Sequence, residues 1–274
     1  MADFLQALVL GTLQGLTEFL PISSSAHLRI FPELFGWGDP GAAFTAVIQI
    51  GTELAVLVYF RHDIARIVKT WTLSLFKPEY RGQLDARMGW FVILGSLPIV
   101  VLGIFLKDTI ESQFRNLWLV ATLLILMGLV LGLADRIGGN EKKIKQMNLR
   151  DAVLMGAAQA MALVPGVSRS GATLSMGRFL GYEREAVTRY SFLLAIPAVV
   201  GAGIYQIGEI PNGENMYGWT PTLVATAVSF VVGYAAIAWL LKFVSHHTLV
   251  PFVVYRVLLG AAVIALLAAG VLSA

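Results

Sequence analysis

The sequence predicts an all-α membrane protein with six transmembrane helices and two re-entrant helical hairpins, arranged as an inverted-topology repeat. Its composition is the first reason. Of 274 residues, 57% are hydrophobic and 14% are charged, whereas soluble domains have roughly 45–50% and 25%. The other reasons are six nearly uncharged stretches of span length and two shorter stretches that end in similar motifs rich in Pro and Ser.

The composition also excludes several classes of protein. A mean hydropathy of +0.74 is too high for a disordered chain or a soluble globule. The absence of cysteine excludes disulfides, thiolate catalysis and Cys-ligated metals. The net charge of +3 does not indicate nucleic acid, because membrane proteins carry Lys and Arg in their cytoplasmic loops. We therefore expect contacts with membrane lipids and none with nucleic acid.

The six predicted spans are stretches that can each cross a bilayer. A helix needs about 20 mostly apolar residues to cross ~30 Å of hydrocarbon. The first span contains one charged residue, Glu53, and the other five contain none. The predicted spans are residues 42–60, 88–106, 116–134, 190–208, 215–241 and 257–274.

The two hairpins are predicted to begin at residues 4–17 and 152–168, which lack charge but do not fit a full span. The first would form a helix of roughly 21 Å, because each residue adds about 1.5 Å. Pro21 follows the first stretch and Pro165 lies inside the second, and serines follow each proline. A broken backbone at membrane depth is tolerated where it is buried in protein or lines a wet cavity. Both stretches therefore indicate a helix that enters, turns and returns.

The distribution of basic residues predicts the orientation. Residues 61–87 carry six Lys or Arg and residues 136–150 carry five, which places both loops in the cytoplasm. Residues 107–115 and 208–218 then lie outside, as do both termini. The first hairpin enters from the outside and the second from the cytoplasm. No basic segment precedes the first apolar stretch, so no secretory signal peptide is expected.

The two hairpins also resemble each other in sequence. Residues 11–14 align with residues 156–159 at an offset of 145, and Pro21 aligns with Pro165 at an offset of 144. Each hairpin is followed by three spans, and this odd number gives the halves opposite topology. Such folds place their site near the midplane, where discontinuous helices meet. We expect a single membrane domain with repeats at 1–134 and 151–274 and a cytoplasmic linker at 135–150.

The first hairpin contains the acid–base candidates. Gln14 and Glu18 are four residues apart, so they share a helix face. An ionised Glu18 near the tip of a membrane hairpin is costly and is a functional candidate by default. The serines at 23–25 can present hydroxyls and backbone N–H groups at a new helix start. His27 can act as an acid or a base near neutral pH.

The second hairpin contains the anion-binding candidates. Arg169 offers a planar fork to phosphate oxygens, and Gly171 lets the backbone approach an anion closely. Hydroxyl donors surround it at Ser168, Ser170 and Thr173. Arg256, inside the last apolar stretch, is a second buried cation. A phosphate or diphosphate, bound opposite Glu18 and His27, explains both hairpins.

Each of these interpretations has a structural alternative. The serine run can simply cap the returning helix, and Arg169 can form a structural ion pair with Glu18. Glu53, one turn after Gln49, is as consistent with a packing partner as with a functional group. His246 and His247 stand beside Lys242, and there we favour solvation at the membrane interface over metal binding.

The chain resembles the bacterial undecaprenyl-diphosphate phosphatase family, whose members are associated with bacitracin resistance. Three stretches carry the resemblance. Residues 14–27 resemble the family's (E/Q)xxxE region and its Ser/His segment, and residues 165–173 match its PGxSRSxxT pattern. Residues 190–197 resemble its FSFLLAIP stretch. Gln14 stands where many members have Glu, so two carboxylates cannot share a metal at that motif. Ser25 and Ala26 replace an expected Thr-Gly.

The resemblance implies a membrane enzyme that hydrolyses the C55 isoprenoid diphosphate to the monophosphate and inorganic phosphate, which recycles the lipid carrier for cell-wall polymers. It implies a polyprenyl diphosphate lipid as substrate and Mg²⁺ or Ca²⁺ as cofactor, with Gln14 and Glu18 as candidate ligands. It also implies location in the bacterial cytoplasmic (inner) membrane, with the site open to the outer face. Gly-rich spans would permit a homodimer, although the sequence does not specify one.

The expected roles follow from the needs of phosphoryl transfer, which are positioning and charge neutralisation. Glu18 and Gln14 orient a cation, a water or the nucleophile, His27 transfers the proton, and either Ser24 or water attacks. Arg169 and Arg256 bind the diphosphate, assisted by hydroxyl or backbone groups of Ser23, Ser25, Ser168, Ser170, Gly171 and Thr173. The alternative is a transporter or flippase of polyprenyl phosphate, because carriers also use inverted repeats and broken helices.

Overall fold

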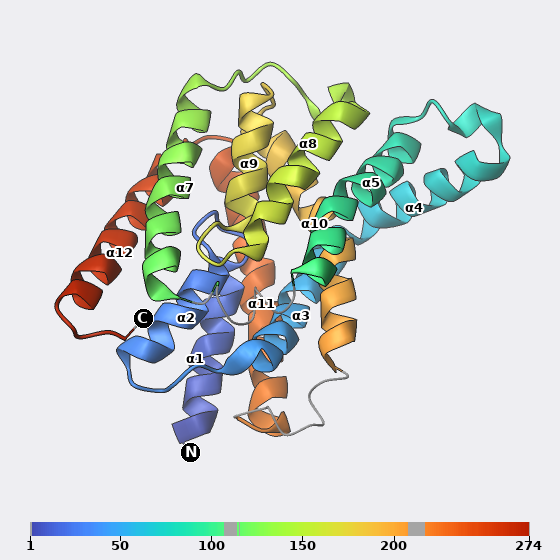
Figure 1. Ribbon diagram of the computed structural model, residues 1–274. Coiled ribbons are helices and arrows are strands. Elements are labelled where there is room, and N and C mark those ends of the chain that lie inside the picture. The colour runs from blue at the N-terminus through green and yellow to red at the C-terminus, as the bar shows by residue number, and fades with distance from the viewer. Residues whose placement is uncertain (1, 107–113, 115, 208–216, 274) are drawn as a thin grey trace.

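The computed structural model describes residues 2–106, 114, 116–207 and 217–273, and within these ranges the chain forms helices and no β-strand (Figure 1). Three short 3₁₀ helices, η1 (Pro78–Tyr80), η2 (Ile144–Gln146) and η3 (Met161–Leu163), connect longer elements. The all-α class is therefore confirmed. The α-helices are α1 (Ala2–Thr17), α2 (Ser24–Leu34), α3 (Gly41–Tyr59), α4 (Arg61–Phe76), α5 (Leu84–Phe105), α7 (Leu117–Ile137), α8 (Leu149–Ala160), α9 (Arg169–Phe179), α10 (Arg184–Ile207), α11 (Trp219–Val244) and α12 (Val250–Ala268).

Several of these helices are suited to cross a membrane. Four of them, α5, α7, α11 and α12, are long and apolar enough, and the bent pair of α3 and α4 would make a fifth. They overlap five of the six predicted spans, and α10 contains residues 190–207 of the remaining one. The predicted outer loops, 107–115 and 208–218, lie almost wholly outside the described residues. The chain thus has the helices of a multi-pass membrane protein.

Two predicted boundaries are wrong for a physical reason. The last span was expected to begin at residue 257, but α12 begins at Val250. The charge of Arg256 does not end this helix, because backbone carbonyls of other segments surround its guanidinium. The basic segment after residue 60 was expected to be a loop, but its first part is α4, which bends 75° from α3 and packs on α5. Figure 1 shows α4 and α5 extending together away from the other helices.

The outer faces of the long helices are apolar. On α7, Leu126, Leu129 and Leu133 are each about half exposed, with relative accessibilities of 51%, 54% and 52%. Their spacing of three and four residues places them on one face of the helix. A continuous exposed leucine face is unsuited to water and suited to lipid.

Both predicted hairpins consist of a short helix, a turn and a second short helix. The first is α1 and α2, and the second is α8, η3 and α9. Ser23 is the N-cap of α2 and Ser168 is the N-cap of α9, and each hydroxyl accepts a backbone N–H three residues later. Among the described residues these two serines, 145 positions apart, are the only non-glycine residues with positive φ, at 73° and 72°. The local conformation of the turn therefore occurs twice.

Each hairpin packs against a long helix from the other half of the chain. Helix α1 lies on α11, and α8 lies on α5. A Cβ at Gly11 would clash with the carbonyl oxygen of Ala225, and a Cβ at Gly156 would clash with that of Gly95. Only glycine allows such close approach of two helix backbones. The two turns meet near the middle of the bundle (Figure 1), where the Ser170 hydroxyl donates to the Leu20 carbonyl at 3.0 Å.

Candidate active site

The carboxylate of Glu18 lies at the centre of a buried polar cluster. Its Oε2 accepts hydrogen bonds from Ser24 Oγ at 2.6 Å and from Gln14 Nε2 at 2.9 Å. Its Oε1 contacts Arg169 Nη2 at 2.8 Å and accepts from Gln49 Nε2 at 3.4 Å. Residues from α1, α2, α3 and α9 therefore converge on one side chain that is only 7% exposed. The structure thus brings the two predicted hairpin motifs together.

The positions of these residues follow from where the short helices begin and end. Glu18 comes directly after α1, and its N–H still donates to the Gln14 carbonyl at 3.0 Å. Ser24 is the first residue of α2, and Arg169 is the first residue of α9. The amino ends of helices carry partial positive charge and free N–H groups. The turns consequently place two helix amino ends beside the carboxylate, an arrangement that favours an anionic ligand.

A second carboxylate, from the middle of α3, completes the cluster. Glu53 Oε1 lies 3.0 Å from Arg169 Nη2, the same nitrogen that contacts Glu18. Glu53 is 2% exposed. Its Oε2 and Arg169 Nη1 are both buried, and neither has a hydrogen-bond partner within the described ranges. The ion pair foreseen between Arg169 and Glu18 is present, but it is part of a triad with Glu53.

The serine clusters of the two turns have matching contacts. The hydroxyls of Ser23 and Ser25 lie 3.1 Å apart, and those of Ser168 and Ser170 lie 3.2 Å apart. The Ser23 and Ser168 hydroxyls also accept backbone N–H groups at the starts of α2 and α9. These two serines therefore cap the returning helices, as the structural alternative for the serine run expected. A ligand role for them would have to be in addition to capping.

Two further predicted diphosphate ligands are oriented toward the protein. The Thr173 hydroxyl donates to the Arg169 carbonyl at 2.9 Å and pairs with the Ser191 hydroxyl of α10. Gly171 donates its N–H to the Ser168 cap at 3.1 Å. A Cβ at Gly171 would lie 2.8 Å from Arg256 Nη1. These residues support the turn. Among the described residues, neither Thr173 nor Gly171 has a hydrogen bond to Glu18.

Arg256 occupies the space between the two turns. It is 0% exposed, and its guanidinium donates to five carbonyl oxygens at 2.7–3.3 Å. The predicted buried cation is thus present, but its N–H groups bind backbone. The carbonyls belong to the first turn, the second turn and α7, at Pro21, Gly166, Val167, Leu123 and Leu124.

His27 is buried on α2, with contacts at both ring nitrogens. Nδ1 lies 2.7 Å from the Ser23 carbonyl, and Nε2 lies 2.6 Å from the Tyr255 hydroxyl of α12. Because a carbonyl oxygen can only accept, Nδ1 carries the proton. The two rings stack with centroids 5.6 Å apart. In this structure Glu18, rather than His27, contacts the Ser24 hydroxyl.

A family comparison and individual relatives identify the family of the chain. The family model described as "Bacitracin resistance protein BacA" matches residues 7–262. The chain belongs to the BacA family. A relative named "Undecaprenyl-diphosphatase" from Nocardioides is 74% identical over 274 residues, which cover 100% of both chains. "Undecaprenyl-diphosphatase 2" from Streptomyces avermitilis is 54% identical, with 99% of this chain and 97% of that protein covered. The resemblance seen in the motifs is therefore confirmed.

In this BacA-family chain, the sequence did not assign three residues that the structure places in or beside the site. Gln49 and Glu53 lie one turn apart on α3 and both reach Glu18 or Arg169. Two polar residues at helical spacing in an apolar span were the signal for them. Tyr255 carried no separate signal, because a tyrosine near a span end is also typical of the membrane interface.

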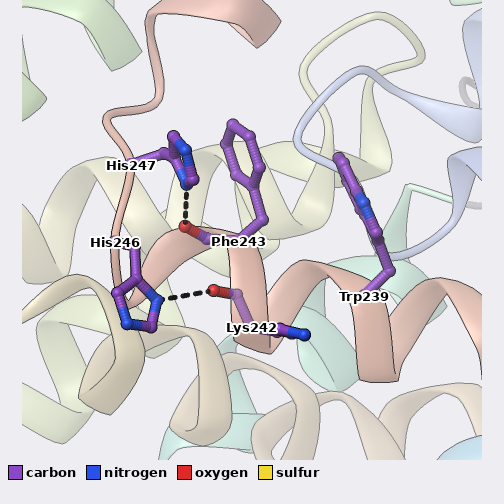
Figure 2. Close-up of a pocket in the computed structure, with 5 residues that line it drawn as sticks. All are labelled: Trp239, Lys242, Phe243, His246 and His247. Atoms are coloured by element: carbon purple, nitrogen blue, oxygen red, sulfur yellow. Dashed lines mark hydrogen bonds between the residues drawn. The ribbon is translucent and has the colours of Figure 1, made fainter.

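A pocket at the far end of α11 lies apart from this BacA site and is shown in Figure 2. His246 Nδ1 lies 3.2 Å from the Lys242 carbonyl, and His247 Nδ1 lies 3.2 Å from the Phe243 carbonyl. The His247 ring stacks on Phe243, which itself stacks on Trp239. Within the described ranges no group of three or more His, Cys, Asp or Glu could hold a metal ion.

Proposed function

We propose that this protein hydrolyses undecaprenyl diphosphate to undecaprenyl phosphate and inorganic phosphate in the cytoplasmic membrane of a bacterium. This activity would recycle the lipid carrier for cell-wall synthesis and confer bacitracin resistance. The single observation that carries the proposal is the contact of Glu18 with both Ser24 and Arg169. It joins a hydroxyl nucleophile, a base and a phosphate-binding guanidinium in one buried place. The relatives' name, undecaprenyl-diphosphatase, supports the substrate.

Arg169 and the two helix amino ends would bind the diphosphate. Nη1 of Arg169 has no hydrogen-bond partner in the part of the chain that the structure describes, and it can donate to a phosphate oxygen. The first turns of α2 and α9 add N–H groups and positive partial charge. The hydroxyls of Ser25 and Ser170 lie in these same first turns. Arg256 acts indirectly, because it holds both turns through their carbonyls.

The contacts favour a covalent route over direct attack by water. In the first step Ser24 Oγ bonds to the terminal phosphorus and its proton passes to Glu18 Oε2, 2.6 Å away. The bond from that phosphorus to the bridging oxygen breaks, and its electron pair leaves with undecaprenyl phosphate. In the second step water attacks the phosphoserine, which restores the hydroxyl and releases inorganic phosphate. Glu18 returns its proton to Ser24 Oγ as the bond between that oxygen and phosphorus breaks, and His27, which contacts the Ser23 carbonyl and the Tyr255 hydroxyl, is not required in this route.

The carboxylates of the site fit a divalent cation, Mg²⁺ or Ca²⁺. These ions prefer oxygen ligands, and Mg²⁺ is usually held by one or two carboxylates together with substrate phosphates. Glu18 supplies such a carboxylate, and Glu53 Oε2, which has no hydrogen-bond partner among the described residues, supports a further ligand there. Gln14 contributes no charge and donates its amide to Glu18. A bound cation would neutralise charge on the diphosphate.

The fold around the site is inferred to be an inverted repeat of a re-entrant hairpin and three spans, with both termini and the site facing outward. Two matching contacts support it. The Ser229 hydroxyl of α11 donates to the Ile48 carbonyl of α3 at 2.6 Å, and the Ser96 hydroxyl of α5 donates to the Leu194 carbonyl of α10 at 3.1 Å. Each long helix thus binds the opposite half in the same way. A homodimer is compatible with the Gly-rich helices and remains a prediction.

The test is phosphate release from C55 diphosphate by the purified protein in detergent, with and without Mg²⁺ or Ca²⁺. Wild type should release phosphate, and Glu18→Ala and Arg169→Ala should each lower the rate by ~10²-fold or more, because the first removes the base beside Ser24 and the second removes the positive charge at the reacting phosphate. Gel filtration and a melting curve verify that the variants fold. Wild type that binds the lipid without releasing phosphate would contradict the proposal and favour a carrier.

A further inference from the structure

Glu53 and Arg169 have unsatisfied polar atoms in the interior of the site. Glu53 Oε2 and Arg169 Nη1 belong to groups joined by a 3.0 Å contact, and neither atom has a hydrogen-bond partner among the described residues. A buried polar group left unpaired is destabilising. Such groups are rare in native proteins, and a bound ion or ligand is one of the explanations for them. The two atoms together mark a place for a ligand with both an acceptor and a positive charge.

The charges of the cluster also indicate a place for a cation. Glu18 and Glu53 both contact Nη2 of Arg169, so two carboxylates share one guanidinium nitrogen. The other side chains that contact Glu18, those of Gln14, Gln49 and Ser24, are neutral. With both carboxylates ionised, the cluster has one negative charge in excess. An uncompensated charge in a low-dielectric interior is strongly unfavourable, and a cation removes the cost.

Residue 14 also lies beside Glu18, but it carries no charge. In this chain residue 14 is Gln, and its Nε2 lies 2.9 Å from Glu18 Oε2 and 3.4 Å from Thr52 Oγ1. Thr52 immediately precedes Glu53 in the sequence. The side chains of residues 14 and 53 therefore flank Glu18 in the same part of the site, and residue 53 carries the charge that residue 14 lacks.

We propose that Glu53 is the second carboxylate of a divalent-cation site shared with Glu18, and that Arg169 Nη1 binds the phosphate that completes this site. The phosphate half of the inference rests on the proposed function. The cation half does not, because it follows from the carboxylates alone. Two carboxylates plus phosphate oxygens and water match the way Mg²⁺ is held in phosphoryl-transfer sites.

The first experiment measures cation binding without substrate. Wild type, Glu53→Gln and Asp151→Asn are melted in detergent with increasing Ca²⁺, followed by tryptophan fluorescence. Asp151 is a matched control: it is a buried carboxylate, 4% exposed, that pairs with Lys142 and Tyr182 outside the site. Ca²⁺ should raise the Tm of wild type and of Asp151→Asn, and the rise should be lost in Glu53→Gln. Equal rises in all three proteins, or none in wild type, would overturn the cation site.

The second experiment measures phosphate release as a function of Mg²⁺. Glu53→Gln should raise the half-saturating Mg²⁺ concentration by roughly 10-fold or more, as for other lost contacts at metal sites. Asp151→Asn should leave it unchanged, although its Tm falls. An unchanged Mg²⁺ dependence in Glu53→Gln would show that Glu53 only packs. Failure of the proposed function would look different, because wild type itself would then release no phosphate.

The third experiment exchanges the two positions. In the double variant Gln14→Glu/Glu53→Gln the site again has two carboxylates beside Glu18. Both the Ca²⁺-induced rise in Tm and the Mg²⁺ dependence should recover to within about 3-fold of wild type, a difference of less than 1 kcal/mol. A double variant no better than Glu53→Gln would overturn the equivalence of the two positions.

Discussion

At the scale of single residues, the site depends on the identity of the group that touches Ser24. The hydroxyl donates to Glu18 at 2.6 Å, while the nitrogens of His27 contact Ser23 and Tyr255. A short hydrogen bond between nucleophile and base is the usual sign of an activated hydroxyl. In the proposed covalent route the base beside Ser24 is therefore a carboxylate that Arg169 also contacts.

Replacement of Ser24 by Ala tests the covalent route. Removal of the attacking group should lower the single-turnover rate by on the order of 10³-fold or more, since no other hydroxyl contacts Glu18 among the described residues. ³²P from labelled substrate should be trapped on wild type and not on the variant. Ser74→Ala, which removes a buried hydroxyl that donates to the Trp71 carbonyl on α4, is the control and should keep the label. A Ser24→Ala protein with unchanged single-turnover rate would establish attack by water.

The residue scale is also where the sequence predicted most. Glu18, Ser24 and Arg169 were found because a charge or a serine run at a hairpin tip violates the rules of an apolar segment. Glu53 violated the same rule, but a single charge inside a long span does not reveal its partner. The partner, Arg169, is 116 residues away and reaches it only through the packing of α9 on the rest of the bundle. Its role could not be decided without a structure.

At the scale of elements, short helices and tight crossings determine where the site lies. The turns were predictable because Pro and Ser act on the backbone nearest to them, and the N-caps at Ser23 and Ser168 confirm it. The bend between α3 and α4 and the early start of α12 were not. Both depend on contacts with distant segments, namely α5 for the bend and five remote carbonyls for Arg256.

The crossing of α8 and α5 should not tolerate a side chain at Gly156. A Cβ there meets the Gly95 backbone, which cannot rotate away as a side chain would. Gly156→Val should therefore destabilise the protein by about 1–3 kcal/mol, the usual cost of overpacking, and lower the Tm by several degrees. Gly82→Val is the control, because its Cβ would have no neighbour within 4 Å. Equal melting temperatures for the two variants would contradict the close contact of α8 with α5.

At the scale of the whole molecule, the proposed orientation can be measured directly. The chain has no cysteine, so single cysteines report their own positions. In intact cells a membrane-impermeant maleimide should label Ser273→Cys, near the external terminus, and should not label Lys143→Cys in the predicted linker until the membrane is opened. The positive-inside rule is the physical basis. The opposite labelling pattern would invert the topology and place the first hairpin on the cytoplasmic side.

The guanidinium of Arg256 has a consequence for how the molecule is made. It donates to the carbonyls of Pro21 and Gly166, so the turn nearest the N-terminus is completed by a residue near the C-terminus. Chains are synthesised from the N-terminus at roughly 5–20 residues per second. This first turn emerges from the ribosome among the earliest segments, and Arg256, which supports it, emerges among the last. A nascent chain therefore has no finished site until nearly all of it has been inserted into the membrane.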